Sequence, residues 1–457
     1  MTGRSSAPGP RTPRDFRLAF LDQTAWALAG ATDRSQLVQA IWVYDRPVDW
    51  AGVQRFVAAF AAGTGNRVVE RARVPFARAR WVRPTAVPAV ADGPTVRPRS
   101  ELLTWADECA RPPLDPEAGP AWRVAVQDFD DGSSAVAMTV SHVIGDAHGG
   151  FQEIGLAISG LGRDPGYAVA GSRGRVVGTA ADLGQVVRDL PATLRGVREW
   201  RRTGRREPRS VEPRPTAPDD DRTVSVPGVV VRVELERWIR CARDAGGNAA
   251  TLLAALAADL AARVGRTGPA GRVSLLVPTN LREGPEDLRA NAFGFGRVVV
   301  PAAAVRDHEF LRSALDDARR AGTEGAGPEV ATVALVPWLT HRGVLRLADR
   351  MFDYAGDPPT SVSNLGVLPA ALGCIDGTEA AWFVARPLDV GVRVRDLRRT
   401  NGHLVVVASA LRSRDRRRRT LTISVEHADA DGHQTRDGLR AVVRATLADL
   451  GLDGRLE

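Results

Sequence analysis

Short apolar runs separated by turn-forming residues divide the first half of the chain into strands and helices. Residues 39–44 (QAIWVY) are typical of a buried strand, and the apolar spacing over residues 50–62 predicts an amphipathic helix. Another helix is expected over residues 101–110. Strands are expected over residues 122–127 and 134–140, and the DFDDGS sequence between them is typical of a hairpin turn.

The second half repeats this alternation of strands and helices. Strands are expected at 229–233, 273–277, 297–300, 360–364, 404–409 and 421–426, and helices at 234–245, 249–264, 307–320 and 436–450. Because strands occur both as hairpins and as helix-separated units, we expect an α/β fold with mixed sheets. No period of 20–50 residues indicates a repeat array.

The length and local composition predict how the chain is organised. A chain of 457 residues favours two domains or one large two-lobed fold. Residues 1–14 are rich in Gly, Pro, Ser and Arg and lack an apolar run, so we expect a disordered tail and not a signal peptide. We assign residues 15–175 to an N-terminal lobe and residues 226–457 to a C-terminal lobe. The Arg- and Pro-rich residues 176–225 predict a helix followed by an exposed linker.

The charged residues exclude several classes of chemistry. The chain has 62 basic and 54 acidic residues, and every basic residue is arginine. Without lysine it cannot be an ordinary P-loop NTPase or a Schiff-base enzyme. Three widely spaced cysteines favour a reducing, cytoplasmic location. No apolar run approaches the roughly 20 residues that span a bilayer, so we expect at most peripheral membrane contact. We expect no nucleic-acid partner, because no recognition helix, zinc finger or interleaved aromatic pattern accompanies the arginines.

The most informative segment is residues 141–150, SHVIGDAHGG. A strand places His142 at its end, and an imidazole there is suited to act as a general base on a hydroxyl or amine. Asp146 can lock the following loop by pairing with an arginine, and the glycines permit close approach. Such a histidine is more often a surface or capped core residue. A metal site formed by His142, Asp146 and His148 lacks a fourth ligand, and we expect no metal.

Further segments give this motif a family context. HVIGDAHGG resembles the HHxxxDG motif of the acyltransferase superfamily. That superfamily contains non-ribosomal peptide condensation domains, chloramphenicol-type acetyltransferases, plant BAHD enzymes and bacterial wax ester synthase/diacylglycerol acyltransferases. RPPLDPEAGPAWRVAV, VPTNLREGPEDLRANAFGFGRVVVP and PPTSVSNLGVLP resemble segments of the last branch, and the likeness runs in order over about residues 15–450.

The resemblance implies a two-lobed, chloramphenicol acetyltransferase-like α/β fold with mixed sheets and a tunnel between the lobes. His142 matches the catalytic base, which would move an acyl group from a CoA or carrier-protein thioester to a small-molecule or lipid hydroxyl or amine. Asp146 would pair with an arginine, for which Arg71 is our candidate, although it lies among many arginines that are typical of a solvated surface. No cofactor is implied beyond the acyl-CoA or phosphopantetheinyl thioester as co-substrate.

Other residues complete the expected site. Ser141 and Gly149 are expected to contact substrate, and Ser363 and Asn364 could donate hydrogen bonds to the oxyanion or acceptor, or simply end a strand. We expect Asn291, Thr279 and Asn280 to be turn or loop residues and Trp338 to fill the core or line an acyl channel. The arginines of residues 412–420 are typical of a solvated face; alternatively they dock an acidic carrier protein, grip CoA phosphates or touch anionic lipid.

Two positions depart from the family motif. The first histidine is replaced by Ser141, and the glycine after the aspartate by Ala147. These changes fit a specialised acyltransferase. They also motivate the alternative that the chain is a catalytically inactive recruitment or binding module of the same fold.

Overall fold

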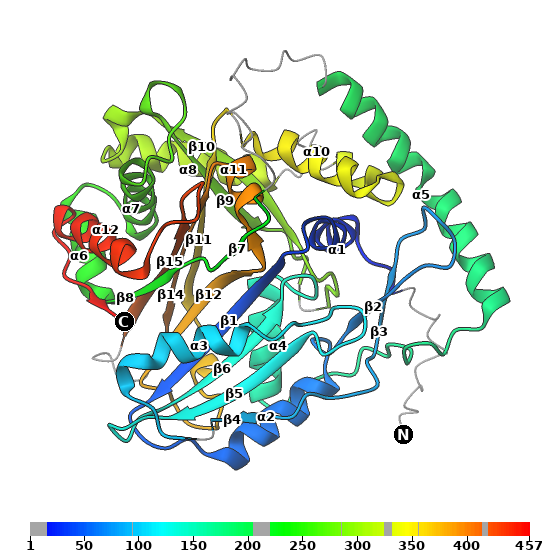
Figure 1. The fold of residues 1–457 in the computed structure, drawn as a ribbon, viewed down its shortest axis with the longest axis horizontal. Coiled ribbons are helices and arrows are strands. Elements are labelled where there is room, and N and C mark those ends of the chain that lie inside the picture. Colours follow the sequence, from blue (N-terminus) through cyan, green and yellow to red (C-terminus); the bar gives the residue numbers. More distant parts are fainter. Residues whose placement is uncertain are drawn as a thin grey trace, which may run out of the picture.

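The computed structural model describes residues 16–93, 95–203, 220–284, 286–323, 331–354, 356–413 and 419–457 (Figure 1). The expected tail at 1–14 lies outside these residues, as do 204–219 of the expected linker and 414–418 of the second arginine run. Two mixed sheets dominate the fold (Figure 1). The α/β class predicted from the alternating pattern is therefore confirmed.

The first sheet contains five strands. In spatial order they are β12 (Trp382–Val390), β1 (Ser35–Tyr44), β6 (Ser134–Ser141), β5 (Trp122–Asp128) and β4 (Ala91–Asp92). β5 and β6 pair as the antiparallel hairpin that the DFDDGS turn predicted. β1 lies between β6 and β12 and is antiparallel to both.

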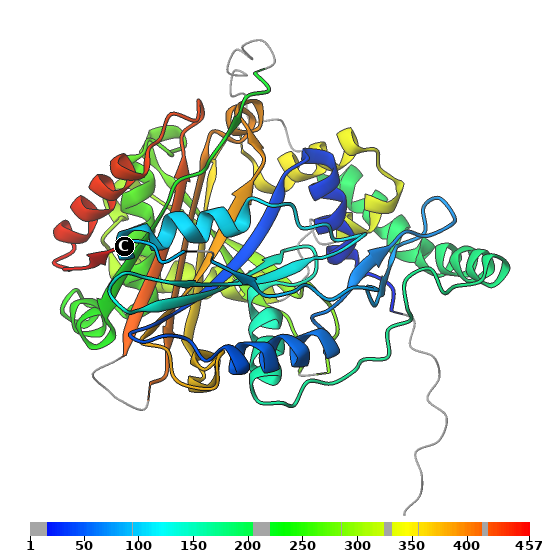
Figure 2. The same ribbon diagram turned by 60° about the horizontal axis from the view of Figure 1, so that its bottom comes forward.

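Helices cover both faces of this sheet, as Figure 2 shows. On one face, α2 (Trp50–Ala62) and α4 (Ala147–Ile158) pack Phe56 and Phe151 against Met138 of β6. On the other face, α3 (Leu102–Ala110) packs Trp105 against Ile41 of β1. Alternate residues of β1 and β6 are therefore buried under different helices, which fixes the strand register.

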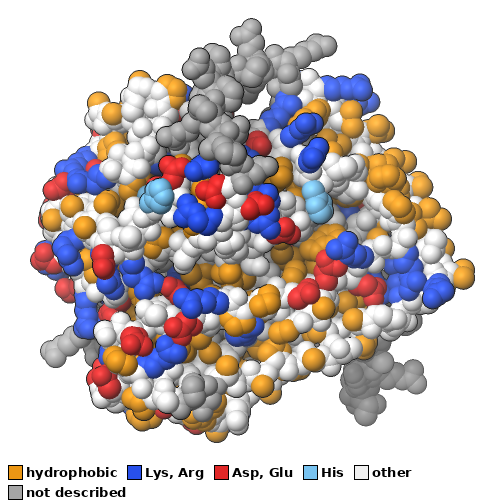
Figure 3. All heavy atoms as spheres, in the orientation of Figure 1, with side chains coloured by type: hydrophobic (Ala, Val, Ile, Leu, Met, Phe, Trp, Pro, Cys, Tyr) orange, Lys and Arg blue, Asp and Glu red, His pale blue; other side chains and the backbone are white. Residues whose placement is uncertain are grey.

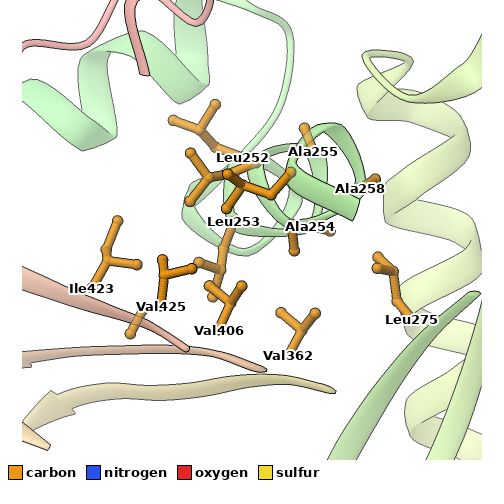
Figure 4. Packing of buried hydrophobic residues seen from close by; sticks show 14 of the residues in the cluster. Leu252, Leu253, Ala254, Ala255, Ala258, Leu275, Val362, Val406, Ile423 and Val425 are labelled. Atoms are coloured by element: carbon orange, nitrogen blue, oxygen red, sulfur yellow. The ribbon is translucent and has the colours of Figure 1, made fainter. Parts of the chain in front are cut away.

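The second sheet contains seven strands. In spatial order they are β10 (Phe293–Val300), β9 (Val273–Asn280), β11 (Pro359–Leu368), β14 (His403–Leu411), β15 (Thr420–Ala428), β8 (Gly228–Glu234) and β16 (Arg455–Leu456). Helix α7 (Ala249–Arg263) packs on one face, where Leu253 lies over Val406 and Val425 (Figure 4). Leu253 and Ala257 are at most 2% exposed, which explains why this helix is apolar on nearly all sides.

The remaining elements surround the two sheets. The α-helices are α1 (Phe20–Thr32), α5 (Arg175–Thr203), α6 (Leu235–Asp244), α8 (His308–Thr323), α10 (His341–Phe352), α11 (Val394–Thr400) and α12 (Arg436–Asp449). The short strands are β2 (Val68–Glu70), β3 (Arg80–Val82), β7 (Thr223–Val224) and β13 (Val392–Arg393), and the 3-10 helices include η4 (Val333–Trp338). Within the described ranges, no single helix has both the length and the apolarity needed to cross a bilayer.

The lobe boundaries need one correction. β12 belongs to the expected C-terminal lobe, 226–457, but it pairs with β1 from Ser35↔Val390 to Val43↔Trp382 and forms an edge of the N-terminal sheet. The sequence pattern did not reveal this strand, because Arg386, Pro387 and Asp389 interrupt its apolar run. Proline is acceptable there because an edge strand needs no donor on its outer side.

Candidate active site

His142 lies where the two sheets meet. β6 ends at Ser141, and the backbone N–H of His142 donates to the carbonyl of Gln36 in β1 at 2.8 Å. The half-buried imidazole meets the ring of Phe293, the first residue of β10, edge to face with centroids 6.2 Å apart. The strand-end position predicted for this histidine is confirmed, and residues of the second sheet form part of its surroundings.

Asp146 anchors the loop that follows. One carboxylate oxygen accepts from the Gly149 N–H at 2.7 Å, which caps the N-terminus of α4. The other accepts from the Ala292 N–H at 2.8 Å, and Arg282 Nη2 donates to both oxygens at 3.1 and 3.0 Å. The two side chains are only 8% and 5% exposed, so this is a buried, charge-assisted link between α4 and the C-terminal half of the chain.

The structure corrects the expected partner of Asp146. Arg71 forms an ion pair with Glu117 at 2.6 Å, lies over the ring of Trp26 and is largely exposed. Arg282, in the loop between β9 and β10, takes the expected role. It lies 136 residues from Asp146, so proximity in the sequence could not select it from the 62 basic residues. A weak signal existed, because Arg282 follows the strand predicted at 273–277 by five residues and lies in a segment that resembles the family.

Two further residues that the sequence reasoning missed hold the same loops. Arg67, 5% exposed, donates through Nε and Nη2 to the Ile144 carbonyl at 3.1 and 2.9 Å and through Nη1 to the Leu288 carbonyl at 2.6 Å. Asp22 of α1 is fully buried and accepts from the Ala290 and Asn291 N–H groups at 3.2 and 2.6 Å. Burial is the main reason that the pKa of Asp22 is raised. An acid within the apolar stretch AFLDQTAWAL was the signal available for Asp22.

Asn291 links these loops. Its side-chain amide donates to the Val143 carbonyl at 3.4 Å and to Asp22 at 3.3 Å. The side chain is 1% exposed, in keeping with the structural role predicted for it. The loop from His142 to Asp146, here called the HxxxD loop, is thus fixed by groups from α1, from the chain before β2 and from the β9–β10 loop.

A cavity opens beside this loop on the α2 and α4 side of the first sheet. About 700 Å³ of empty space, open solvent included, lies between its lining residues. Its apolar lining consists of Val38, Ala40, Phe60, Met138, Val140, Ile144, Phe151 and Ile154. Because side chains alternate along β6, Met138 and Val140 lie on one face of the sheet. The cavity therefore lies between this face of the sheet, the loop that follows His142 and the helices α2 and α4.

Charged groups border the cavity. Arg67, Asp146, Glu153 and Arg282 contribute to its wall. The pKa of Glu153 is raised mainly by burial, which the positive charge of Arg67 and a hydrogen bond with Thr64 partly oppose. An apolar floor with a charged border suits a ligand with a hydrocarbon part and a polar end.

The remaining predicted residues occupy varied positions. The Ser141 hydroxyl is buried and accepts from the Val143 N–H at 3.4 Å, inside the turn. Gly149 does allow a close approach, but by the Arg282 guanidinium, since a Cβ there would lie 2.4 Å from Nη2. In β11, Ser363 is half-buried, and the exposed Asn364 accepts from the Gly366 N–H at 3.0 Å. Contact of these four residues with substrate stays a prediction.

Three further expectations concern residues outside the HxxxD loop. Thr279 and Asn280 are the last residues of β9 and not loop residues. Trp338 is not in the core, since it is 37% exposed and stacks on Phe76 at 4.4 Å. Among the described residues, no three His, Cys, Asp or Glu side chains are grouped so that they could hold a metal ion.

Comparisons with known proteins address the fold. No family model matches the chain, and no curated protein matches it. The first condensation domain of the CDA synthetase is 16% identical, with a TM-score of 0.57, over 96% of this chain and 97% of that one. The chain has the condensation-domain fold. The two-lobed architecture predicted from the resemblance is therefore confirmed, whereas the assignment to the wax ester synthase branch stays a prediction.

Two other structures share the condensation-domain fold. The starter condensation domain of the rhizomide synthetase, solved as a mutant in complex with C8-CoA, is 14% identical. Its TM-score is 0.52 over 95% of this chain and 94% of that one. A structure that addresses condensation domain-mediated chain release from the enacyloxin polyketide synthase is 18% identical to this chain. Its TM-score is 0.50 over 98% of this chain and 84% of that one.

Proposed function

We propose that this protein is an acyltransferase that moves an acyl group from a CoA or carrier-protein thioester to a hydroxyl or amine. The observation that carries the proposal is the position of His142, at the junction of the two sheets and at the start of a loop that buried charges fix and whose residues 144–147 line an apolar cavity. The C8-CoA complex of the rhizomide synthetase domain supports an acyl thioester as donor. No metal or redox cofactor is needed for this reaction.

The proposed reaction needs one general base, His142, and one bound thioester. The imidazole of His142 takes the proton of the acceptor O–H or N–H as that oxygen or nitrogen attacks the thioester carbonyl carbon. The tetrahedral intermediate then expels the thiolate as the C–S bond breaks, and the imidazolium returns the proton to the sulfur. An ester or amide and a free thiol result, and the histidine regains its starting state.

The loop and the cavity have separate roles in this scheme. Asp146 directs both carboxylate oxygens to Arg282 and backbone N–H groups, so it positions the loop that follows His142 and is not a proton carrier. The apolar lining that includes Met138, Val140 and Phe151 is suited to the hydrocarbon part of the acyl group. Donor preference should therefore depend on the cavity, and turnover on His142.

The test is thiol release from acyl-CoA and acyl-carrier thioesters of two to sixteen carbons, with mixed alcohol and amine acceptors. His142→Ala should lower acceptor-dependent turnover by about 10²–10⁴, the usual contribution of a general base. His148→Ala is the matched control, because this exposed histidine lies six residues on and should leave turnover within about twofold. Equal turnover of wild type and His142→Ala would refute the proposed base. Binding of a carrier protein with no turnover by either would favour the recruitment module.

A second variant tests the cavity. Val140→Phe adds a ring to the cavity wall, so kcat/KM should fall at least tenfold for long acyl donors and stay within about threefold for acetyl-CoA. The acetyl donor is the internal control for folding and for the base. An equal effect on both donors would show that the acyl group lies elsewhere.

A further inference from the structure

Helix α5 (Arg175–Thr203) turns its polar side toward the protein. Asp182 is fully buried and accepts from Arg17 and Arg173, each at 2.7 Å. Gln185, 2% exposed, accepts from the Arg78 N–H at 2.9 Å. Charge-assisted and hydrogen-bonded contacts thus attach the N-terminal half of this helix, where an ordinary surface helix places apolar residues, whereas Gly196 and Trp200 pack against Leu335 and a small apolar cluster farther along.

The outer side of α5 is apolar. Five large side chains are exposed at spacings of seven, four, three and four residues: Val176 (82%), Leu183 (53%), Val187 (64%), Leu190 (40%) and Leu194 (56%). These spacings place them on one line along the helix, about 27 Å long at 1.5 Å per residue, which we call the α5 stripe. An exposed apolar patch of this kind marks an interaction site.

Arginines accompany the α5 stripe. Arg188, Arg195 and Arg202 recur every seven residues, so they follow one edge of it. Arg198 and Arg201 continue its line toward the C-terminal end of the helix, and all five side chains are exposed. Figures 1 and 2 show α5 along the outer edge of the molecule, and Figure 3 shows hydrophobic side chains along that edge with basic ones at its ends.

Two exposed aromatic rings lie beside the helix. Phe76 (49% exposed) and Trp338 (37%) stack with centroids 4.4 Å apart and planes 7° from parallel. The loop that carries Phe76 is attached to α5 by Arg73 N–H to Asp182 and by the Arg78–Asp189 ion pair, both at 2.7 Å. Trp338 ends η4, which packs against α5. Phe76 has φ of 70°, which bulky residues rarely adopt, so the loop holds this ring outward at a conformational cost.

We propose that the α5 stripe is a docking surface for an anionic lipid bilayer, on which α5 lies parallel to the membrane plane. Leucine and valine on one line, arginines along the edge and exposed Trp and Phe alongside are the composition of interfacial helices. The arginines meet the negative headgroups while the stripe enters the region below them. This binding is independent of acyl transfer.

A second copy of the chain fits the stripe less well. If two α5 helices packed stripe to stripe in parallel, Arg198 and Arg201 of both copies would meet. If they packed antiparallel, the rows formed by Arg188, Arg195 and Arg202 would face each other. Like charges repel in both arrangements, whereas anionic headgroups attract these arginines.

The experiment is flotation of the full chain with vesicles of 70% phosphatidylcholine and 30% phosphatidylglycerol, against pure phosphatidylcholine. Wild type should float only with the anionic vesicles and be released by 0.5 M salt. The triple variant Leu183→Ser, Val187→Ser and Leu194→Ser should bind at least tenfold more weakly. Its matched control changes three residues of similar exposure elsewhere to serine: Val87 (54%), Val96 (63%) and Leu161 (64%).

The arginines are tested in the same way. Arg195→Gln, Arg198→Gln and Arg201→Gln together should weaken binding about a hundredfold, at about fivefold for each cation near an anionic surface. The control removes the same charge from α6 and α12, with Arg240→Gln, Arg243→Gln and Arg444→Gln, and should lose at most a few-fold. Circular dichroism and thiol release verify that each variant is folded.

Three outcomes would overturn the proposal. The first is wild-type protein that does not float with anionic vesicles. The second is equal weakening by the test and control variants, which would indicate a non-specific charge or solubility effect. The third is a wild-type dimer in light scattering that the serine variant dissociates while vesicle binding is absent, which would make the stripe a contact between copies.

Discussion

Adjacent glycines in the first turn of α4 allow a sharp test of the link between Asp146 and Arg282. A Cβ at Gly149 would lie 2.4 Å from Arg282 Nη2 and 2.8 Å from Cζ, whereas a Cβ at Gly150 would meet nothing within 4 Å. The guanidinium cannot simply swing away, because it also donates to the carbonyls of Asp287, Arg289 and Ala290 at 2.8–3.3 Å. Gly149→Ala should therefore separate Arg282 from Asp146.

The magnitude follows from two opposing effects. Replacing helical glycine with alanine stabilises by at most about 1 kcal/mol at either position. Breaking a buried ion pair costs about 3–5 kcal/mol. Gly150→Ala should thus be neutral or stabilising by up to about 1 kcal/mol, and Gly149→Ala should destabilise the loop by about 2–4 kcal/mol. The difference between the variants isolates the clash, because the backbone change is the same.

The assay is amide hydrogen exchange at Ala292, whose N–H donates to Asp146 and whose sequence context is identical in all three proteins. A loss of about 3 kcal/mol in local stability corresponds to exchange about 150-fold faster. Gly149→Ala should show this acceleration, and Gly150→Ala should match wild type. Similar exchange rates at Ala292 in both variants would refute the reasoning that Arg282 is held in place.

Three other expectations follow from buried groups. Asp146→Asn should lower the free energy of unfolding by about 3 kcal/mol and also lower thiol release. Both carboxylate oxygens accept hydrogen bonds, and an amide has only one such oxygen. Wild-type values in thermal unfolding and in thiol release would contradict this. Burial lowers the pKa of His403 to about 4, so stability should fall as pH drops from about 6.5 to about 4, where only the unfolded state takes up the proton. His403→Gln should flatten this dependence in melting curves, and parallel curves would argue against it. Leu253→Ala should cost about 2–5 kcal/mol and lower the melting temperature without changing turnover per folded molecule; a change in turnover would show that α7 is coupled to the site.

The sequence predicts the elements whose pattern is local. The helix at 50–62 has the predicted bounds, and the hairpin ending in His142 differs from the prediction by one residue at each strand's end. Apolar periodicity and Asp-Gly turn chemistry act over a few residues, so they can be read without knowledge of the fold. The same holds for the motif, because His142 and Asp146 stand close together in one short segment of the sequence.

Features that depend on distant pairing could not be predicted from this pattern. Arg282 is recognisable as the partner of Asp146 only once β9 and α4 are placed together, and Arg71 was the wrong choice because sequence distance says nothing about that placement. β12 was not predicted because Arg386, Pro387 and Asp389, which an edge strand tolerates, interrupt its apolar run. The helix α5 was expected, but the burial of its polar side was not, because that burial depends on distant partners such as Arg17.

The position of β12 also affects how the protein is made. The N-terminal sheet has its β1, β5 and β6 strands once residue 141 has left the ribosome, but the strand that covers the outer edge of β1 ends at Val390. At about 5–20 residues per second, that edge waits roughly 10–50 s for its neighbour during synthesis. Until β12 is made, β1, which carries Ile41 and Trp42, would pair with any other exposed strand edge. Expression of the first 225 residues alone should therefore yield aggregates, and co-expression with the remainder should restore solubility.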